Sequence, residues 1–480
     1  MIRSFLALLL ICFLRLPSAA QLQRPPDAPP AASDAQQAQS APAPSLDAFS
    51  GSGIVDKPVA GVIKLGLLEA LERGLKHNLG LLLSQQQTAA ARAQHWRNLS
   101  ALLPNVSARV SESVQQVNLA AFGIPFTVNG STIVGPFAIF DARPVITERL
   151  LDFNALGRLR AADENEKAAR FNVQDARELV VLVVGNEYLL ALADSARLES
   201  TRAELETAKV IFERSQDLKK TGVAAGIDVL RSQVQMQQQQ QRVLAAENQL
   251  LQQRMKLARV IGLPVSQAFE LTDAVPNTPT PPLELEEALQ RAYARRPDYL
   301  ALLSRVRSAE LQVKAARGEA LPTIDLNGDF GAIGQTVGSS RQTFTVAGSL
   351  RIPIFQGGRV KGDVMQAQSA LDQLRSQLED MKSRIEFEVR STALDVKTSI
   401  EQVAVARQSI ELAGEQLKQA QDRYASGVSG SLEVVQAQES VATADETYIQ
   451  ALYRNNVAKL TLAKALGVAE QQARAVLGGR

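Results

Sequence analysis

Apolar residues in the last third of the chain recur at every seventh position over a range that contains no proline. The range runs from Arg359 to Tyr424, and its apolar series is Val389, Val396, Val403, Ile410, Leu417 and Tyr424, with Ala406, Ala413 and Ala420 in neighbouring turns. A spacing of seven is typical of a coiled coil, and the alanines let helices approach closely. At 1.5 Å per residue, one helix over this range would be about 100 Å long. The pattern predicts a tall bundle of helices.

Shorter stretches alternate apolar and polar residues with the period of two that half-exposed strands show. Residues 324–330 alternate in this way, and residues 343–352 return with the same alternation. An earlier pair is weaker, with residues 106–110 going out and a less regular return between Phe137 and Leu151. The sequence therefore predicts four strands, arranged as two separated hairpins among long helices.

The second half of the chain repeats the first. Leu103-Pro104 matches Leu321-Pro322 at an offset of 218, and later landmarks match at an offset of 205: Gly222 with Gly427, Asp228 with Glu433, and Gly262 with Gly467. Each copy has the order helix, strand pair, very long helix, tight turn, helix. We expect a first repeat over 61–275 and a second over 283–470, with the extra residues of the first copy enlarging a loop.

Two segments precede the repeats. Arg3, the apolar run from Phe5 to Leu14 and the small residues up to Ala20 predict a secretory signal peptide over residues 1–20. Residues 21–60 are rich in Pro, Ala, Gln and Ser, which predicts a disordered leader. Loss of the signal peptide would remove Cys12, the only cysteine. The sequence predicts an exported protein.

Charge and composition exclude several classes of protein. The 52 basic and 50 acidic residues are interleaved, so no positive field favours nucleic acid. Two histidines and one cysteine make a metal centre a poor expectation, and neither histidine lies in a catalytic motif. Gly357-Gly358 lacks the spacing of a phosphate-binding loop. We expect no enzyme, no catalytic residue, no metal and no cofactor.

Two hairpins leave strand edges unpaired, so the strands must pair with others. Beyond the signal peptide no stretch approaches the roughly 18 apolar residues of a spanning helix, because polar residues interrupt the best candidate, Leu179–Ala193. A closed barrel is the other structure that crosses a bilayer, and the smallest have about eight strands. Several chains would then pool strands. The alternative is a periplasmic structural coiled coil without a pore, whose hairpins cap a water-soluble rod.

The order of these landmarks resembles the TolC-type outer membrane efflux family. The residues that carry the resemblance are the two Leu-Pro breaks, the passage Pro353–Arg359, Tyr424–Gly427 and Leu432–Val435, and it extends over 61–470. The resemblance implies a mostly α-helical homotrimer with a shared twelve-stranded barrel in outer membrane lipid and a helical extension in the periplasm. It also implies a passive exit duct of a tripartite efflux or secretion system, docked to a periplasmic adaptor protein and an inner membrane pump or secretion transporter.

Site residues follow from the same resemblance. The resemblance places the two helix-to-helix turns at the periplasmic tip, where they would contact the adaptor. The residues of these turns are Gly222, Val223, Gly427 and Val428. At the periplasmic entrance, Asp228 and Tyr424 would form a polar latch, and Glu433 would belong to an acidic ring. Where some members have a clamping arginine this chain has Ser429, and a second acidic position is filled by Gln436.

Overall fold

The computed structural model describes residues 46–53, 56–127, 130–222, 225–276 and 284–477. The predicted signal peptide lies outside the described residues, and so does most of the predicted leader. From Leu46 onward the leader prediction is wrong, because α1 (Leu46–Phe49) packs against the helices. Phe49 is buried over Gly80, and the Asn78 side chain donates a hydrogen bond of 2.7 Å to its carbonyl oxygen. The buried ring of Phe49 and backbone hydrogen bonds to His77 and Leu79 together attach this short segment.

The described residues are mostly helical, and their elements form two similar runs. The first run comprises β1 (Ile63–Leu65), α2 (Leu67–His77), α3 (Leu79–Ser100), β2 (Asn105–Asn118), β3 (Ile133–Leu151), α4 (Phe153–Lys220), α5 (Gly226–Ile261) and β4 (Phe269–Leu271). The second comprises α6 (Leu285–Arg295), α7 (Pro297–Gly318), β5 (Thr323–Gly334), β6 (Arg341–Arg351), α8 (Arg359–Ala425), α9 (Ser431–Ala465) and α10 (Ala469–Leu477). The predicted duplication is visible in this order.

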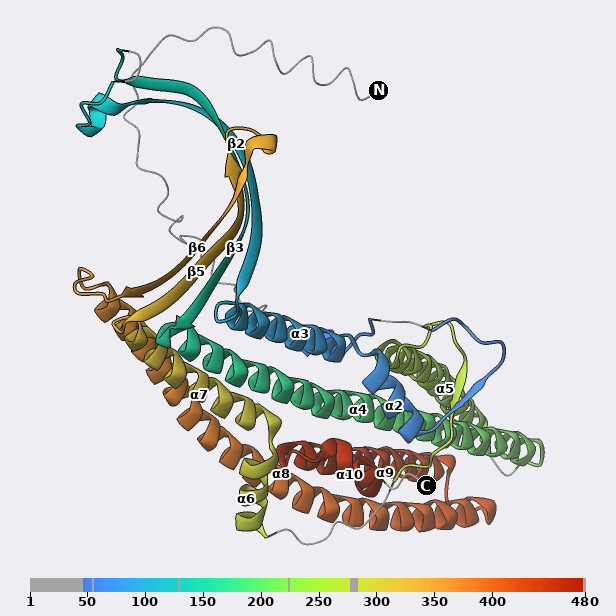
Figure 1. Ribbon diagram of the computed structural model, residues 1–480. Helices are drawn as coiled ribbons and strands as arrows, with labels where there is room; N and C mark the ends of the chain where they lie inside the picture. Colours follow the sequence, from blue (N-terminus) through green and yellow to red (C-terminus); the bar gives the residue numbers. More distant parts are fainter. Residues whose placement is uncertain (1–45, 54–55, 128–129, 223–224, 277–283, 478–480) are drawn as a thin grey trace, which may run out of the picture. The chain divides into compact units, whose positions relative to one another are not determined.

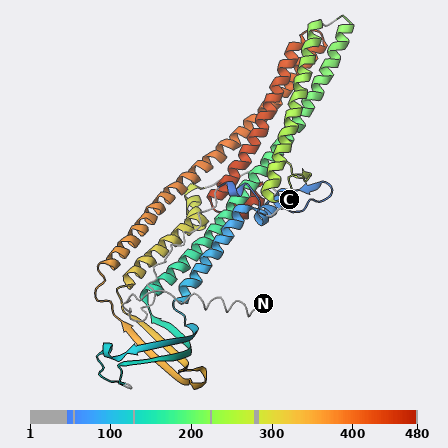
Figure 2. The ribbon, with the colours of Figure 1, turned by 90° about the horizontal axis from the view of Figure 1, so that it is seen from above.

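The four long strands form one antiparallel sheet in the order β2-β3-β5-β6. Figures 1 and 2 show this sheet curving away from one end of the long helices. The extra residues of the first copy do not only enlarge a loop, because β2 and β3 have 14 and 19 residues whereas β5 and β6 have 12 and 11. Because β2 contains many polar residues, the period-two pattern of apolar residues revealed only part of its length. A separate parallel pair, β1 and β4, closes the first repeat.

The long helices are held together by the residues that the spacing of seven singled out. Val389 is fully buried, Val396 and Tyr424 are almost fully buried, and the alanines of the neighbouring turns are buried as well. The helices α4 and α8 contain 68 and 67 residues, which confirms the expected length. The largest cluster of buried side chains joins α2, α4, α5, α8 and α9 about halfway along α4, around Tyr188 and Leu460.

Among the described helices, α4 is the one whose length and hydropathy would suffice to cross a membrane. Its most apolar window is 56% buried inside the protein. Val180, Val184 and Tyr188 are completely buried in that stretch, where they pack in the main core. The apolar composition of α4 is therefore accounted for by helix packing.

Candidate functional site

The tips of the two helical hairpins contain the glycines that the duplication predicted. Gly222 follows α4 with φ 78°, and Gly427 follows α8 with φ 73°. A side chain at either position would meet no atom within 4 Å, so the requirement for glycine comes from the left-handed backbone and not from crowding. Val428 is exposed beside Gly427. Val223 lies outside the described residues.

Tyr424 does not contact Asp228 within the chain, contrary to the expected latch. The Tyr424 hydroxyl lies 3.0 Å from the Ser215 hydroxyl of α4, and its ring packs among Ile211, Ala420 and Val434. Tyr424 continues the spacing of seven, so its ring lies inside the bundle. There the nearest polar partner is the α4 serine, which the sequence analysis did not single out.

Asp228 has a different partner. The Ser431 hydroxyl at the start of α9 donates a hydrogen bond of 2.6 Å to Asp228 Oδ1, in the first turn of α5. Asp228 also lies near Arg231, with 3.8 Å between Oδ1 and Nη1. Both tip hydrogen bonds, Tyr424 with Ser215 and Ser431 with Asp228, thus join the first hairpin (α4 and α5) to the second (α8 and α9).

Glu433 is partly exposed and forms an ion pair across its own hairpin. Its Oε1 atom lies 3.4 Å from Nε of Arg423, on the last turn of α8. Each of the two residues lies five positions from Val428, a symmetry that would have identified Arg423 from the sequence. The Ser429 hydroxyl is buried and has no hydrogen-bond partner among the described residues. The negative charge expected at Glu433 is therefore offset in part by a neighbouring cation.

The sheet has one polar and one apolar face. Adjacent rows of paired residues show this: one row across the four strands contains Asn105, Thr147, Asn327 and Ala347, and the next contains Val106, Ile146, Gly328 and Val346. Because successive side chains point to opposite faces, the rows alternate between the register shifts at Gln115–Val117 and Arg149–Leu151. On the apolar face, Val106, Ile146, Val346 and other large side chains are exposed to solvent within one chain.

Charged residues pair with one another on the polar face. Arg143 of β3 contacts Asp141 of the same strand at 2.5 Å and Asp329 of β5 at 2.9 Å. Nearer the helices, Arg149 contacts Asp325 at 3.3 Å and Asp152 at 2.9 Å. The arginines of the polar face thus donate hydrogen bonds to neighbouring aspartates. Two acidic residues, Glu112 and Glu148, lie on the otherwise apolar face.

The two halves of the chain match the family model described as outer membrane efflux protein, over residues 70–263 and 288–468. The outer membrane protein OprJ of Pseudomonas aeruginosa is 26% identical over 470 residues, which cover 91% of this chain and 94% of OprJ. The pyoverdine export outer membrane protein OpmQ of Pseudomonas putida is 25% identical over 317 residues, covering 65% and 67%.

Solved structures share the fold. The CmeC outer membrane channel of Campylobacter jejuni superimposes with a TM-score of 0.72 at 18% identity, covering 85% of this chain and 89% of CmeC. The open MtrE channel of Neisseria gonorrhoeae gives 0.72 at 19% identity, covering 86% and 94%. These structures confirm the expected fold. The family model and the sequence relatives confirm the outer membrane location and support the channel interpretation over the coiled coil without a pore. The chain belongs to the outer membrane efflux protein family.

Proposed function

We propose that this chain is a passive exit duct of a tripartite efflux system, acting as a conduit and not as an enzyme. The observation that carries the proposal is the two-faced sheet with open edges at β2 and β6. A sheet whose apolar face is exposed in one chain needs lipid on that face, and a polar face is suited to a water-filled lumen. Strands from several chains would close the barrel and remove the edges.

We propose that three copies of the chain assemble, and exposed apolar residues on the helices support this proposal. Large apolar side chains remain exposed along both hairpins of a single chain: Ile227, Leu230, Val234, Leu244 and Leu251 on α5, and Phe387, Leu394, Val405 and Leu412 on α8. Exposed apolar stripes of this length are typical of subunit interfaces. Four strands per chain then give a twelve-stranded barrel.

The hairpin tips are the surface that we propose for a periplasmic adaptor, which would connect the duct to an inner membrane transporter. Gly222, Val223, Gly427 and Val428 would form that contact. Asp228, Tyr424 and Glu433 would surround the entrance, where Asp228 and Tyr424 act through their serine partners and not through each other. Three copies of Glu433 would produce a weakly negative ring, because Arg423 accompanies each carboxylate.

A matched pair of arginine substitutions on β6 tests the membrane barrel. Val346 lies on the apolar face and Thr345 on the polar face, next to each other in the middle of the strand. An arginine facing lipid near the bilayer midplane costs about 2–4 kcal/mol. We therefore expect Val346→Arg to reduce the amount of trimer in the outer membrane, measured by fractionation and gel mobility.

The Thr345→Arg variant is the control, because it adds the same charge to the same strand. We expect it to assemble normally and to change ion selectivity in single-channel recordings. If Val346→Arg reached the outer membrane as efficiently as Thr345→Arg, the barrel assignment would be wrong and a periplasmic coiled coil would be favoured instead.

A further inference from the structure

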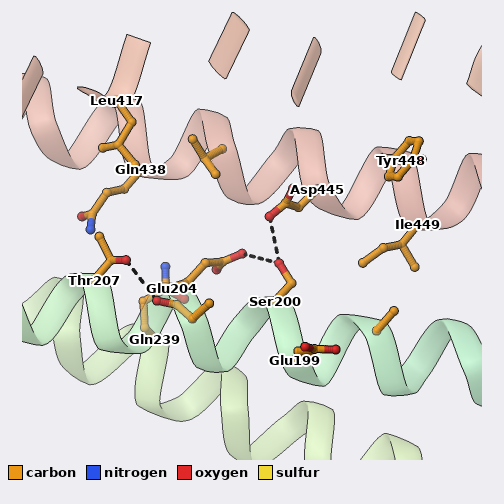
Figure 3. A pocket seen from close by; sticks show the side chains of 13 residues that line it. Glu199, Ser200, Glu204, Thr207, Gln239, Leu417, Gln438, Asp445, Tyr448 and Ile449 are labelled. Carbon is orange, nitrogen blue, oxygen red and sulfur yellow. Dashed lines mark hydrogen bonds between the residues drawn. The ribbon is translucent and has the colours of Figure 1, made fainter. Parts of the chain in front are cut away.

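A partly open cavity of about 380 Å³ lies between the two helical hairpins of one chain. Figure 3 shows its walls, which come mainly from α4 and α9 with one side chain each from α5 and α8. Cavities of about 300–1,000 Å³ are typical of small-molecule sites. None of the tip residues or strand residues named above lines this cavity, which is formed by the long helices alone.

Three carboxylates line the cavity, namely Glu199 and Glu204 from α4 and Asp445 from α9. The Ser200 hydroxyl lies 2.9 Å from Asp445 Oδ2 and 3.4 Å from Glu204 Oε1, as the dashed lines of Figure 3 mark. A hydroxyl has one proton to donate, so it satisfies only one of these two carboxylates. The described residues that line the cavity include no lysine, arginine or histidine. The site therefore has an excess of negative charge.

The electrostatic environment of Glu204 agrees with this excess. Burial raises the pKa of the Glu204 carboxyl, and the negative charge of Asp445 raises it further. Arg242 offsets part of the effect, although its guanidinium group is hydrogen-bonded to Glu439. A cation placed between Glu204 and Asp445 would relieve this repulsion.

Two buried amides that line the cavity supply an independent indication of a binding site. Gln239 is 2% exposed and Gln438 is 7% exposed, and both line the cavity. The side-chain oxygen of each has no hydrogen-bond partner among the described residues. An unsatisfied buried acceptor costs about 1–3 kcal/mol, so a donor that enters the cavity would be stabilising. In Figure 3 Gln438 extends from α9 toward Thr207, across the space between the helices.

The remaining walls determine the kind of cation. Leu417, Val441 and Ile449 provide apolar surface, and Tyr448 adds an aromatic ring. The described residues contain no group of three or more His, Cys, Asp or Glu side chains that could hold a metal ion. The ligand should thus combine a charged N–H donor with an apolar body.

We propose that this cavity is a binding site for an organic ammonium or amidinium cation. The charged N–H groups donate to Glu204 and Asp445, and a further N–H reaches the buried amide oxygen of Gln438. The apolar body packs against Leu417, Val441 and Ile449. The site lies within one chain, so its existence depends neither on the trimer nor on a membrane pore.

Calorimetric titration of the purified full chain in detergent tests the proposal with benzamidinium as the probe. Benzamide is the matched neutral ligand, because it has the same ring and nearly the same shape. We expect benzamidinium to bind about tenfold more tightly than benzamide, as charge-assisted hydrogen bonds predict. Glu204→Gln and Asp445→Asn should each weaken benzamidinium binding by about tenfold and leave benzamide binding unchanged.

Glu206→Gln is the control, because Glu206 lies on the same helix, pairs with Lys209 and does not line the cavity. A second variant, Ala203→Trp, fills the cavity from an exposed position and retains every carboxylate. It should abolish binding while circular dichroism shows unchanged helix content. Equal affinity for the two ligands, or unchanged binding in Ala203→Trp, would overturn the proposal.

Discussion

Replacing Arg296 with methionine should destabilise the helices more than any exposed charge change. The Arg296 side chain is 3% exposed and lies between α6 and α7. Its guanidinium group bonds Asp298 at 2.7 Å and Glu388 of α8 at 2.6 Å, and it lies 3.5 Å from the carbonyl oxygen of Ala465 in α9. This one side chain connects three long elements of the second repeat.

Removing one partner of a buried ion pair costs about 3–5 kcal/mol, because the other charge is left unpaired in the interior. Here the carboxylates are partly hydrated, with Asp298 20% and Glu388 35% exposed, so we expect the lower end, about 3 kcal/mol. The assay is urea unfolding of the purified protein followed by circular dichroism. Arg291→Met is the control: it breaks an exposed pair with Glu287 and should cost less than about 1 kcal/mol.

The pH dependence provides a second check on the same reasoning. Burial alone would raise the pKa of Asp298, but the hydrogen bond and charge of Arg296 hold it below its ordinary value. The stability from this lowered pKa is present above the unfolded-state value of about 4 and is lost as the pH falls through the folded-state value. The gap between wild type and Arg296→Met should therefore narrow below about pH 4. A loss under 1 kcal/mol that does not change with pH would refute this account.

Two further predictions concern glycines. Gly427→Val should reduce efflux in a complementation assay, because a β-branched residue in the left-handed region costs at least about 1–2 kcal/mol. Gly427→Asn should retain nearly wild-type efflux, since asparagine tolerates this region. Equal efflux in both variants would show that the left-handed backbone at this turn is not required. In the same urea unfolding assay, Gly157→Ala should destabilise the protein by about 1–3 kcal/mol, since its Cβ would lie 2.7–2.8 Å from Ala315 of α7. The control is Gly414→Ala on α8, whose Cβ would meet no atom within 4 Å, so it should be neutral or stabilising. If both alanine variants behaved alike, close packing of α4 on α7 would not explain Gly157.

The features that could be predicted from sequence are those with a short repeat along the chain. The spacing of seven through Val389 and Val396 gave the buried face of α8, and the Leu-Pro breaks placed both hairpins. The polar contacts between the two hairpins could not be predicted, because the pairing of Tyr424 with Ser215 depends on how far one hairpin is shifted along the other. Likewise, four helices contribute to the cavity around Glu204, and no local pattern identifies residues that far apart.

The two serine-mediated bonds at the tips have a mechanical consequence. Each bond connects a helix of the first hairpin to a helix of the second within one chain, Tyr424 to Ser215 and Ser431 to Asp228. In the proposed trimer, six hairpins would thus move as three coupled pairs. Widening the entrance by sliding one chain against its neighbour leaves both bonds intact, whereas splaying one chain's own hairpins breaks them. Splaying of the hairpins within one chain therefore costs two hydrogen bonds that displacement of whole chains leaves in place.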